Sequence, residues 1–154
     1  MATTFSLTGT LRLVPRWEDD VSPANLVDAT TFLQTFSIAQ GTATGQANAY
    51  WRDVRAVAAG DTDEIELDTL PLAVMGGTGN LDLATVRMVY LRNRGTVTLS
   101  PLIGGGQFDV PPGGSFFWHA PATVAAGPIA ASLEVQNSAA SAGSYEILLV
   151  GVKA

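Results

Sequence analysis

The chain of 154 residues contains no cysteine and a single histidine, His119. Without cysteine there is no disulfide and no thiolate metal ligand, so stability has to come from packing and hydrogen bonds. A structural zinc site needs several His or Cys ligands, and the chain offers one. These absences argue against a disulfide scaffold and a zinc centre, and we expect no metal or other cofactor.

Charge is also scarce. Charged residues make up 14% of the chain and hydrophobic residues 47%, whereas about 25% of an ordinary domain is charged. So few charges cannot cover the surface, and large exposed apolar patches usually mark interfaces. We therefore expect other subunits to cover part of the molecule, with a homo-oligomer, most simply a trimer, as the first candidate.

The charges that are present are mainly acidic. The net charge is −6, and seven of the eight basic residues are arginine, with Lys153 the only lysine. Phosphate binding requires a basic patch, so this balance argues against nucleic acid or an anionic membrane as partner. No apolar run approaches the ~18 residues that span a bilayer, and the start MATTFSLTGT lacks the features of a signal peptide. We expect a soluble chain made in a cytoplasm.

What the sequence does contain is period-two alternation, which predicts an all-β fold. Sixteen glycines and eight prolines separate about eight to ten short antiparallel strands, typical of a β-sandwich or jelly roll. We expect one domain over residues 1–154. Within it, 50–58 should be an edge strand, while 85–93 and 145–152 should lie inside a sheet because they are apolar at both parities.

Three connections can be predicted from their residues. Residues 14–30 should form a long loop, in which Ser22-Pro23 could cap a short helical turn and which could serve for attachment. Asn93-Arg94-Gly95 should join 85–93 to 96–100 in a hairpin. Pro112-Gly113 should occupy the centre of a type II turn, where Gly supplies the positive φ.

The candidate chemistry is weak. A Ser-His-Asp triad would have to use His119, with Ser115 or another serine as nucleophile and Asp109 as a possible orienting acid. No nucleophile-elbow sequence is present, and an ordinary histidine at a strand end is the favoured interpretation. We do not expect an enzyme. Glycine-rich stretches at 76–79 and 104–106 lack the following Lys-Ser/Thr of a phosphate loop and should be turns.

Three further groups of side chains have two interpretations each. A solvated strand face is favoured over a calcium site for the carboxylates Asp61, Asp63, Glu64, Glu66 and Asp68. Core packing is favoured over a subunit contact or a sugar-stacking platform for the aromatics Trp17, Trp51, Trp118, Phe116 and Phe117. A solvated face is favoured over pairing with the acidic strand of a neighbouring copy for Arg87, Arg92 and Arg94.

The order of motifs from about Ala49 onward resembles a group of small virion proteins of tailed phages and prophages. The motifs are YWRDVRAVAAGDTDEIELD, VRMVYLRNRG, FDVPPGGSFFWHAP, SLEVQNS and YEILLVG. The resemblance implies a non-enzymatic capsid decoration protein, located in the virion, that binds and stabilises the shell through contacts with its own copies and the major capsid protein. The alternative is a tail or head fibre component, or a carbohydrate- or receptor-binding module. The first forty residues fall outside the resemblance.

Overall fold

The computed structural model describes residues 6–13, 17–19, 26–28, 32–103, 106–119 and 132–154, and in this part the chain is almost entirely β-structure. The only helix in these ranges is the short 3-10 helix η1 (Leu72–Met75). The strands are β1 (Leu7–Leu13), β2 (Trp17–Asp19), β3 (Leu26–Asp28), β4 (Phe32–Gln40), β5 (Gln46–Ala47), β6 (Ala49–Val57), β7 (Thr62–Glu66), β8 (Leu70–Pro71), β9 (Asn80–Leu81), β10 (Leu83–Asn93), β11 (Ser100–Ile103), β12 (Gly106–Gln107), β13 (Ser115–His119), β14 (Ser132–Gln136) and β15 (Gly143–Lys153).

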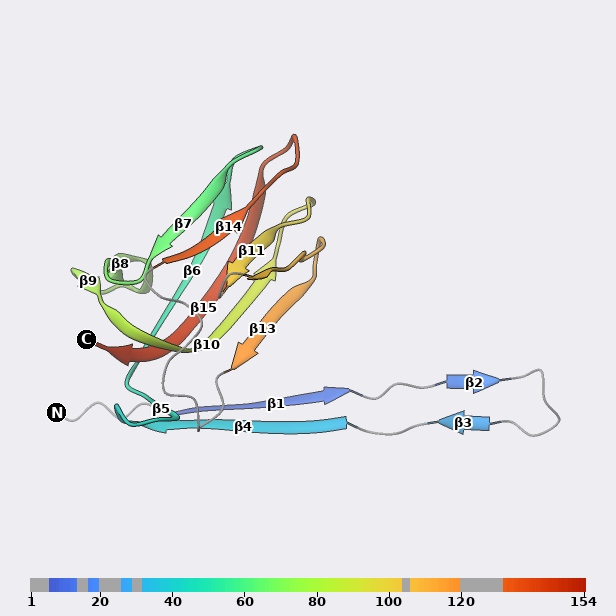
Figure 1. The fold of residues 1–154 in the computed structure, drawn as a ribbon, viewed down its shortest axis with the longest axis horizontal. Coiled ribbons are helices and arrows are strands. Elements are labelled where there is room, and N and C mark those ends of the chain that lie inside the picture. The colour runs from blue at the N-terminus through green and yellow to red at the C-terminus, as the bar shows by residue number, and fades with distance from the viewer. Residues whose placement is uncertain (1–5, 14–16, 20–25, 29–31, 104–105, 120–131) are drawn as a thin grey trace.

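Two four-stranded sheets make up the body of the molecule (Figure 1). Their strand orders are β13-β10-β15-β6 and β12-β11-β14-β7, and every pairing within them is antiparallel. If these eight strands are numbered one to eight in chain order, the strand order is 6-3-8-1 in the first sheet and 5-4-7-2 in the second. This is the jelly-roll arrangement of two interlocked antiparallel sheets, and it confirms the predicted all-β sandwich.

The hydrophobic core lies between the two sheets. It combines inward residues of the first sheet, such as Trp51, Val89 and Tyr145, with Leu133 and Val135 of the second, all of them fully buried. Strand β14 shows how the sequence produces this core. Leu133 and Val135 are buried, while the alternate residues Ser132, Glu134 and Gln136 are partly exposed. Alternation of this kind places every second side chain in the core.

The predicted positions of the strands within the first sheet are confirmed. Strand β6 lies at its edge, and β10 and β15 lie inside it. The pairing of β10 with β15 shifts register twice, between Leu83 and Thr85 and between Val86 and Met88. Val86, Arg87, Met88 and Val89 are all buried in this irregular stretch, so a strict alternation of faces does not apply there.

The predicted hairpin between 85–93 and 96–100 is wrong. Strand β10 pairs with β13 and β15, whereas Ser100 already belongs to β11 in the other sheet. The chain crosses between sheets at the fully buried Asn93, whose Nδ2 donates to the carbonyl oxygens of Val97 (2.7 Å) and Val110 (2.8 Å). These bonds hold the 94–99 segment around the end of the sandwich. The apolar-polar alternation in that segment therefore does not indicate a strand paired with β10 in a hairpin.

The predicted type II turn is confirmed. Gly113 has φ +73°, and the backbone N–H of Gly114 donates to the carbonyl oxygen of Pro111 at 2.9 Å. Val110 before the turn bridges to Leu99, while β13 after it pairs with β10 in the first sheet. The turn is therefore a corner at which the chain passes from one sheet to the other.

Two short paired strands lie within the range 14–30 that is predicted as a loop. Strands β1 and β4 pair antiparallel up to Leu13↔Phe32, and β2 and β3 pair from Trp17↔Asp28. From the first pair to the second, the residue number rises by four on one strand and falls by four on the other, so the two paired pieces, which we call the ribbon, share one antiparallel register. The prediction failed because a short apolar-polar strand next to prolines and acidic residues gives little periodicity. Ser22-Pro23 lies outside the described residues.

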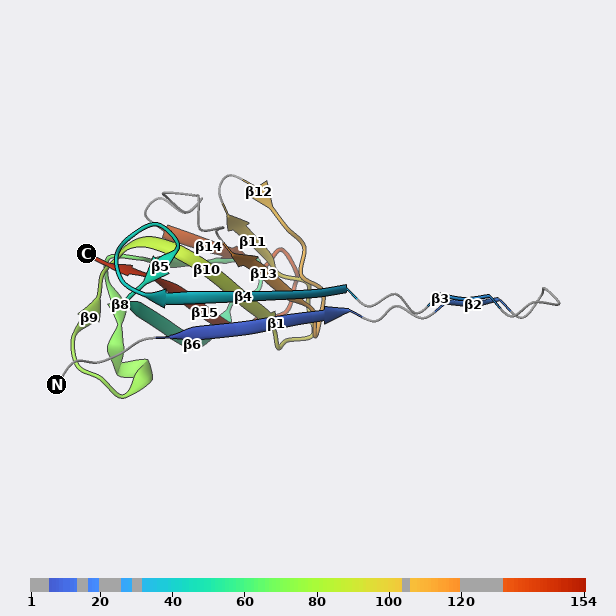
Figure 2. The same cartoon turned by 90° about the horizontal axis from the view of Figure 1, so that it is seen from below.

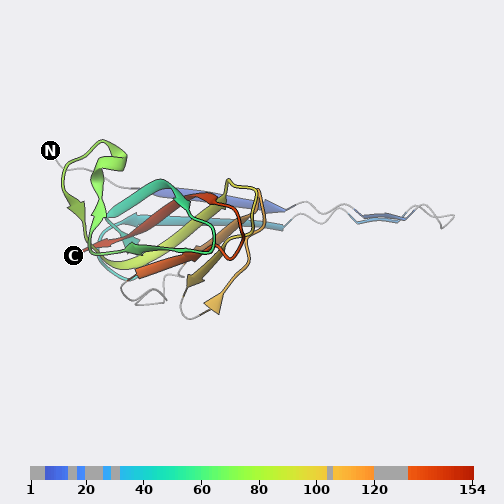
Figure 3. The ribbon, with the colours of Figure 1, turned by 90° about the horizontal axis from the view of Figure 1, so that it is seen from above.

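The ribbon is anchored on the body and then leaves it. Ile38 of β4 and Ala47 of β5 are buried against Met88 and Val150 of the first sheet, with Phe36 among the partly buried residues packed around them. Figures 1, 2 and 3 show β1 and β4 crossing this sheet and β2 and β3 extending beyond the sandwich. No helix in the described ranges is long and apolar enough to cross a membrane.

Candidate interaction surface

The register of the first sheet defines which side chains share its outer face. Residues directly opposite one another on paired strands point to the same side. One row across the sheet is therefore Ser115, Arg92, Glu146 and Val54, and the next is Phe117, Tyr90, Leu148 and Arg52. A third row contains His119, Met88, Val150 and Tyr50. We call these three rows the outer face.

The ribbon covers only part of the outer face. Met88 and Val150 are buried beneath it, and Phe36 stacks at 5.2 Å between ring centroids on both Phe117 and His119. The rest of the outer face remains open: Val54, in the row furthest from the ribbon, is 58% exposed, and Phe117, although it touches Phe36, is 44% exposed. These two apolar side chains lie on the two edge strands of the sheet, and exposed apolar side chains on one face are typical of a contact surface.

The open part of the outer face carries an excess of positive charge. Arg52, Arg92 and Arg94, the last of them at the end of β10 beside the three rows, lie near two carboxylates. Glu146 approaches Arg94 to 3.9 Å, and Asp53 is already paired with Arg55. In the described part of the chain, neither Arg52 nor Arg92 forms an ion pair. A shallow hollow in this region is lined by Arg52, Asp53, Val54, Arg94 and Glu146, together with Val74 of η1. A partner with carboxylates and some apolar surface suits this chemistry.

The structure does not assemble a triad from Ser115, His119 and Asp109. Ser115 and His119 lie at opposite ends of β13, four residues and about 13 Å apart along the strand. Ser115 Oγ lies 3.5 Å from the hydroxyl of Tyr90, and Asp109 accepts a hydrogen bond from Ser100 at 2.8 Å. Burial lowers the pKa of His119 below its usual value, consistent with a strand-end histidine packed on Phe36.

The acidic segment divides between two faces, so the prediction of one solvated row is wrong at Asp63. Glu64, Glu66 and Asp68 are exposed, whereas Asp63 points the other way together with buried Ile65. Asp63 is held by an ion pair with Arg55, whose Nε and Nη2 donate to its oxygens at 2.7 and 2.6 Å. Among the described residues no cluster of three or more His, Asp or Glu is placed to hold a metal ion.

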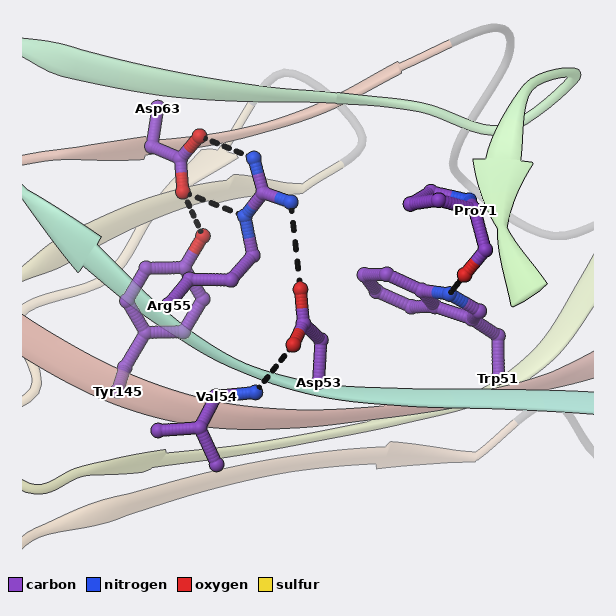
Figure 4. A network of polar contacts seen from close by, with 7 residues as sticks. All are labelled: Trp51, Asp53, Val54, Arg55, Asp63, Pro71 and Tyr145. Atoms are coloured by element: carbon purple, nitrogen blue, oxygen red, sulfur yellow. Dashed lines mark hydrogen bonds and ion pairs between the residues drawn. The ribbon is translucent and has the colours of Figure 1, made fainter. Parts of the chain in front are cut away.

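Asp63, Arg55 and Tyr145 form a polar network that joins the two sheets at their β6 and β7 edges (Figure 4). The Tyr145 hydroxyl donates to Asp63 at 2.6 Å. Burial alone would disfavour the charged carboxylate, but the hydrogen bonds from Arg55 and Tyr145 outweigh it and lower the pKa of Asp63. Burial, reinforced by the bond to Asp63, raises the pKa of Tyr145. The network satisfies its own charges and is a structural clamp between the sheets.

The aromatic residues confirm the core interpretation in part. Trp51 is fully buried, and its indole N–H donates to the carbonyl oxygen of Pro71 at 3.0 Å (Figure 4). Trp118 and Phe116 are partly buried and pack against the same core. Phe117 is the exposed member of the group. The side chain of Trp17 lies outside the described part of the structure.

The arginines predicted as one solvated row are divided as well. Arg87 is 4% exposed, because it lies in the irregular stretch of β10. Arg92 and Arg94 are exposed and lie near each other at the end of β10. The glycines of 76–79 confirm the turn interpretation, since Gly76 caps η1 with φ +79° and Gly79 has the same φ. Gly104 and Gly105 lie outside the described residues.

Sequence reasoning missed the part of the outer face supplied by β6. Arg52 and Val54 share one parity of the segment YWRDVRAVA, and both are exposed, whereas Trp51 and Val57 on the other parity are buried. The alternation itself contained this signal. Only the register with Glu146 and Leu148, which periodicity does not give, shows that Arg52 and Val54 join Arg92 in one surface.

No protein-family model and no curated protein matches the chain. Among solved structures, the chain is similar to a de novo designed double-stranded β-helix determined by solution NMR. The identity is 11% and the TM-score 0.41, over 64% of this chain and 97% of the designed one.

Proposed function

We propose that this chain is a non-enzymatic structural subunit of a tailed-phage virion, of the capsid decoration type, which acts by binding its own copies and the assembled shell. The observation that carries the proposal is the ribbon. Strands β2 and β3 continue the register of β1 and β4 out beyond the sandwich (Figure 1). An extension of this kind does not serve the core of its own domain and suits contacts between subunits.

The physics of small β-structures supports an assembly role. An isolated two-stranded hairpin is marginal in water and usually gains its stability from a third strand or a packed surface. The open rows of the outer face present a second surface that is available for contact, with Val54 and Phe117 exposed. A subunit with a projecting ribbon and an open sheet face carries two different surfaces, and contact between the ribbon of one copy and the face of the next can be repeated from copy to copy.

The motifs that resemble virion proteins fall on the sandwich and not on the ribbon. They cover β6 and β7, then β10, β13, β14 and β15. On this proposal the sandwich is the shared scaffold of such subunits, and the ribbon is the attachment device of this particular chain. That division agrees with the expectation that residues 14–30 serve attachment.

The proposal is tested on phage particles. Particles induced from the strain that carries the gene would be purified on a density gradient, and their proteins identified and counted by mass spectrometry. We expect the chain in many copies per particle, co-migrating with the major capsid protein. Purified chain should also bind particles from a strain in which the gene is deleted. Its absence from intact particles, together with no binding to the deleted ones, would contradict a virion role.

A further inference from the structure

The distal ribbon, defined as the paired segments Trp17–Asp19 and Leu26–Asp28, is acidic for its length. Its six residues include the three carboxylates Glu18, Asp19 and Asp28 and no basic residue. They also include the apolar residues Leu26 and Val27. A segment that is both acidic and apolar needs a partner that is basic and apolar.

The outer face of the sandwich has this complementary character. Arg52, Arg92 and Arg94 outnumber the two carboxylates beside them, Glu146 and Asp53, on a chain whose net charge is −6. Asp53 is already paired with Arg55. Exposed Val54 and Phe117 lie in the same two rows. The excess of arginine therefore lies on a sheet face that remains partly open, and it lies beside apolar side chains.

The figures show that a ribbon does not occupy the open rows of its own sandwich. Figures 1 and 3 show β2 and β3 pointing away from the body in two perpendicular views. Figure 2 shows β1 and β4 crossing the first sheet before the ribbon leaves it. The complementary surfaces are thus separated within one molecule, and a second molecule can bring them together.

We infer that the distal ribbon of one copy docks on the open rows of the outer face of a second copy, with its carboxylates against Arg52, Arg92 and Arg94. The inference rests on the proposed function, because it names the partner for the surface by which the subunit assembles. The contact is head-to-tail, so repetition closes it into a ring or extends it over a lattice. Charge selects the partner surface, and the apolar residues supply burial.

The first test is a charge swap measured by light scattering at several protein concentrations. The face variant R92E/R94E and the ribbon variant E18K/D19K should each raise the dissociation constant of the wild-type oligomer by about tenfold or more. The quadruple variant, in which the reversed face meets the reversed ribbon, should recover most of the loss. High salt should weaken the wild-type oligomer, because exposed charges are screened.

A matched control separates the contact from the change in net charge. E64K/E66K alters the charge by the same amount as the ribbon variant, on exposed side chains of β7 in the other sheet. We expect this variant to keep the wild-type dissociation constant. Circular dichroism should give all variants the wild-type spectrum, since the exchanged side chains lie outside the core.

The second test uses the absence of cysteine. A chain with Val27→Cys on the ribbon is mixed with a chain with Val54→Cys on the outer face, and a short bismaleimide is added. We expect a cross-linked heterodimer from this mixture and little from a mixture of Val27→Cys with Glu66→Cys. Equal yields from the two mixtures would overturn the inference.

The outcomes also separate the inference from the proposed function. An oligomer whose mass is unchanged by either charge reversal overturns the ribbon contact but leaves a self-assembling subunit. A wild-type chain that is monomeric at every concentration overturns docking on a second copy, and if it still binds phage particles, the virion role stands with the shell as partner. Absence from particles contradicts the virion role whatever the solution mass.

Discussion

Two asparagines are buried at the points where the chain leaves a strand. Asn93 donates to two backbone carbonyls and accepts from the N–H of Gly95 at 3.0 Å. Asn137 donates to the carbonyls of Val57, Ala58 and Ser141 and accepts from the N–H of Ala139. A side-chain amide carries donors and an acceptor on one group, so it can satisfy both kinds of backbone group where a ladder ends.

Replacing Asn93 with alanine should lower the free energy of unfolding by about 3 kcal/mol, because buried carbonyls and an N–H lose their partners. The change is measured by urea denaturation. Asn80→Ala, at an exposed position of β9, serves as the control and should cost less than about 0.5 kcal/mol. Equal losses in the two variants would show that Asn93 does not hold the crossover between the sheets.

The Asp63 network should make stability depend on pH at both ends. The pKa of Asp63 is lowered in the folded state, so its contribution is present above the unfolded pKa of about 4 and is lost as the pH falls through the folded value. The pKa of Tyr145 is raised, so its contribution is present below the unfolded pKa of about 10 and is lost as the pH rises above it.

Asp63→Asn should destabilise the fold by about 2 kcal/mol at pH 7, since it takes two short charged hydrogen bonds from Arg55 and leaves the guanidinium with only the longer contact to Asp53 at 3.5 Å. It should also flatten the acid side of the stability curve below about pH 4. Denaturant titrations across the pH range measure both effects. Glu64→Gln, on the exposed face of the same strand, is the control and should change neither the stability at pH 7 nor its pH dependence by much. If Asp63→Asn still loses stability below about pH 4 as the wild type does, that loss arises from other groups.

At the scale of elements, the irregular stretch of β10 depends on a glycine in β15. A Cβ built on Gly151 would lie 2.0 Å from the carbonyl oxygen of Thr85, so only glycine permits the two strands to approach there. Gly151→Ala should therefore cost more than about 2 kcal/mol, because the obstacle is backbone and cannot rotate away. Gly60→Ala, with φ +71° and no neighbour within 4 Å, isolates the cost of backbone conformation and should lose only about 1 kcal/mol. Thermal unfolding compares the pair, and similar shifts in the two variants would contradict the close-approach argument.

The same scale shows what sequence could predict. Periodicity found the edge strand β6 and the inner strands β10 and β15, since these depend on local patterns, but it did not find β11 or β12. It failed for 96–100 and Asp63. Val97 and Leu99 alternate whichever sheet receives them, so the pattern could not reveal the crossover held by Asn93. Asp63 has the parity of Ile65, which marks it as inward, but its partner Arg55 lies on another strand.

The candidate interaction surface depends on the pairing of strands even more strongly than the positions of 96–100 and Asp63 do. Arg52, Glu146 and Arg92 belong to three strands and become neighbours only through the registers of β6 with β15 and of β15 with β10. A shift of one residue in either pairing would change which residues face outward together. The ribbon was missed for a related reason, because its strands are recognisable by their shared register and carry few residues each.

At the scale of the whole molecule, the sandwich and the distal ribbon should be energetically separate. Every member of the main core lies between Trp51 and Leu149, and the cluster beneath the ribbon uses Ile38, Ala47, Met88 and Val150. None of these residues belongs to the distal ribbon. Removing that ribbon should therefore leave the packing of the body intact.

The variant that tests this separation replaces residues 14–31 with Asn-Gly. Leu13 and Phe32 are already paired, and a two-residue Asn-Gly loop closes an antiparallel hairpin with the twist of its strands. We expect the free energy of unfolding of the monomer, measured by urea denaturation at low protein concentration, to stay within about 0.5 kcal/mol of wild type. Light scattering of the same variant should show the loss of the oligomer. A loss of stability above about 2 kcal/mol would make the distal ribbon part of the folding unit. A stable but monomeric variant would mean that the ribbon contributes to assembly and not to the fold, because its removal would leave the free energy of unfolding unchanged and abolish the contact between copies.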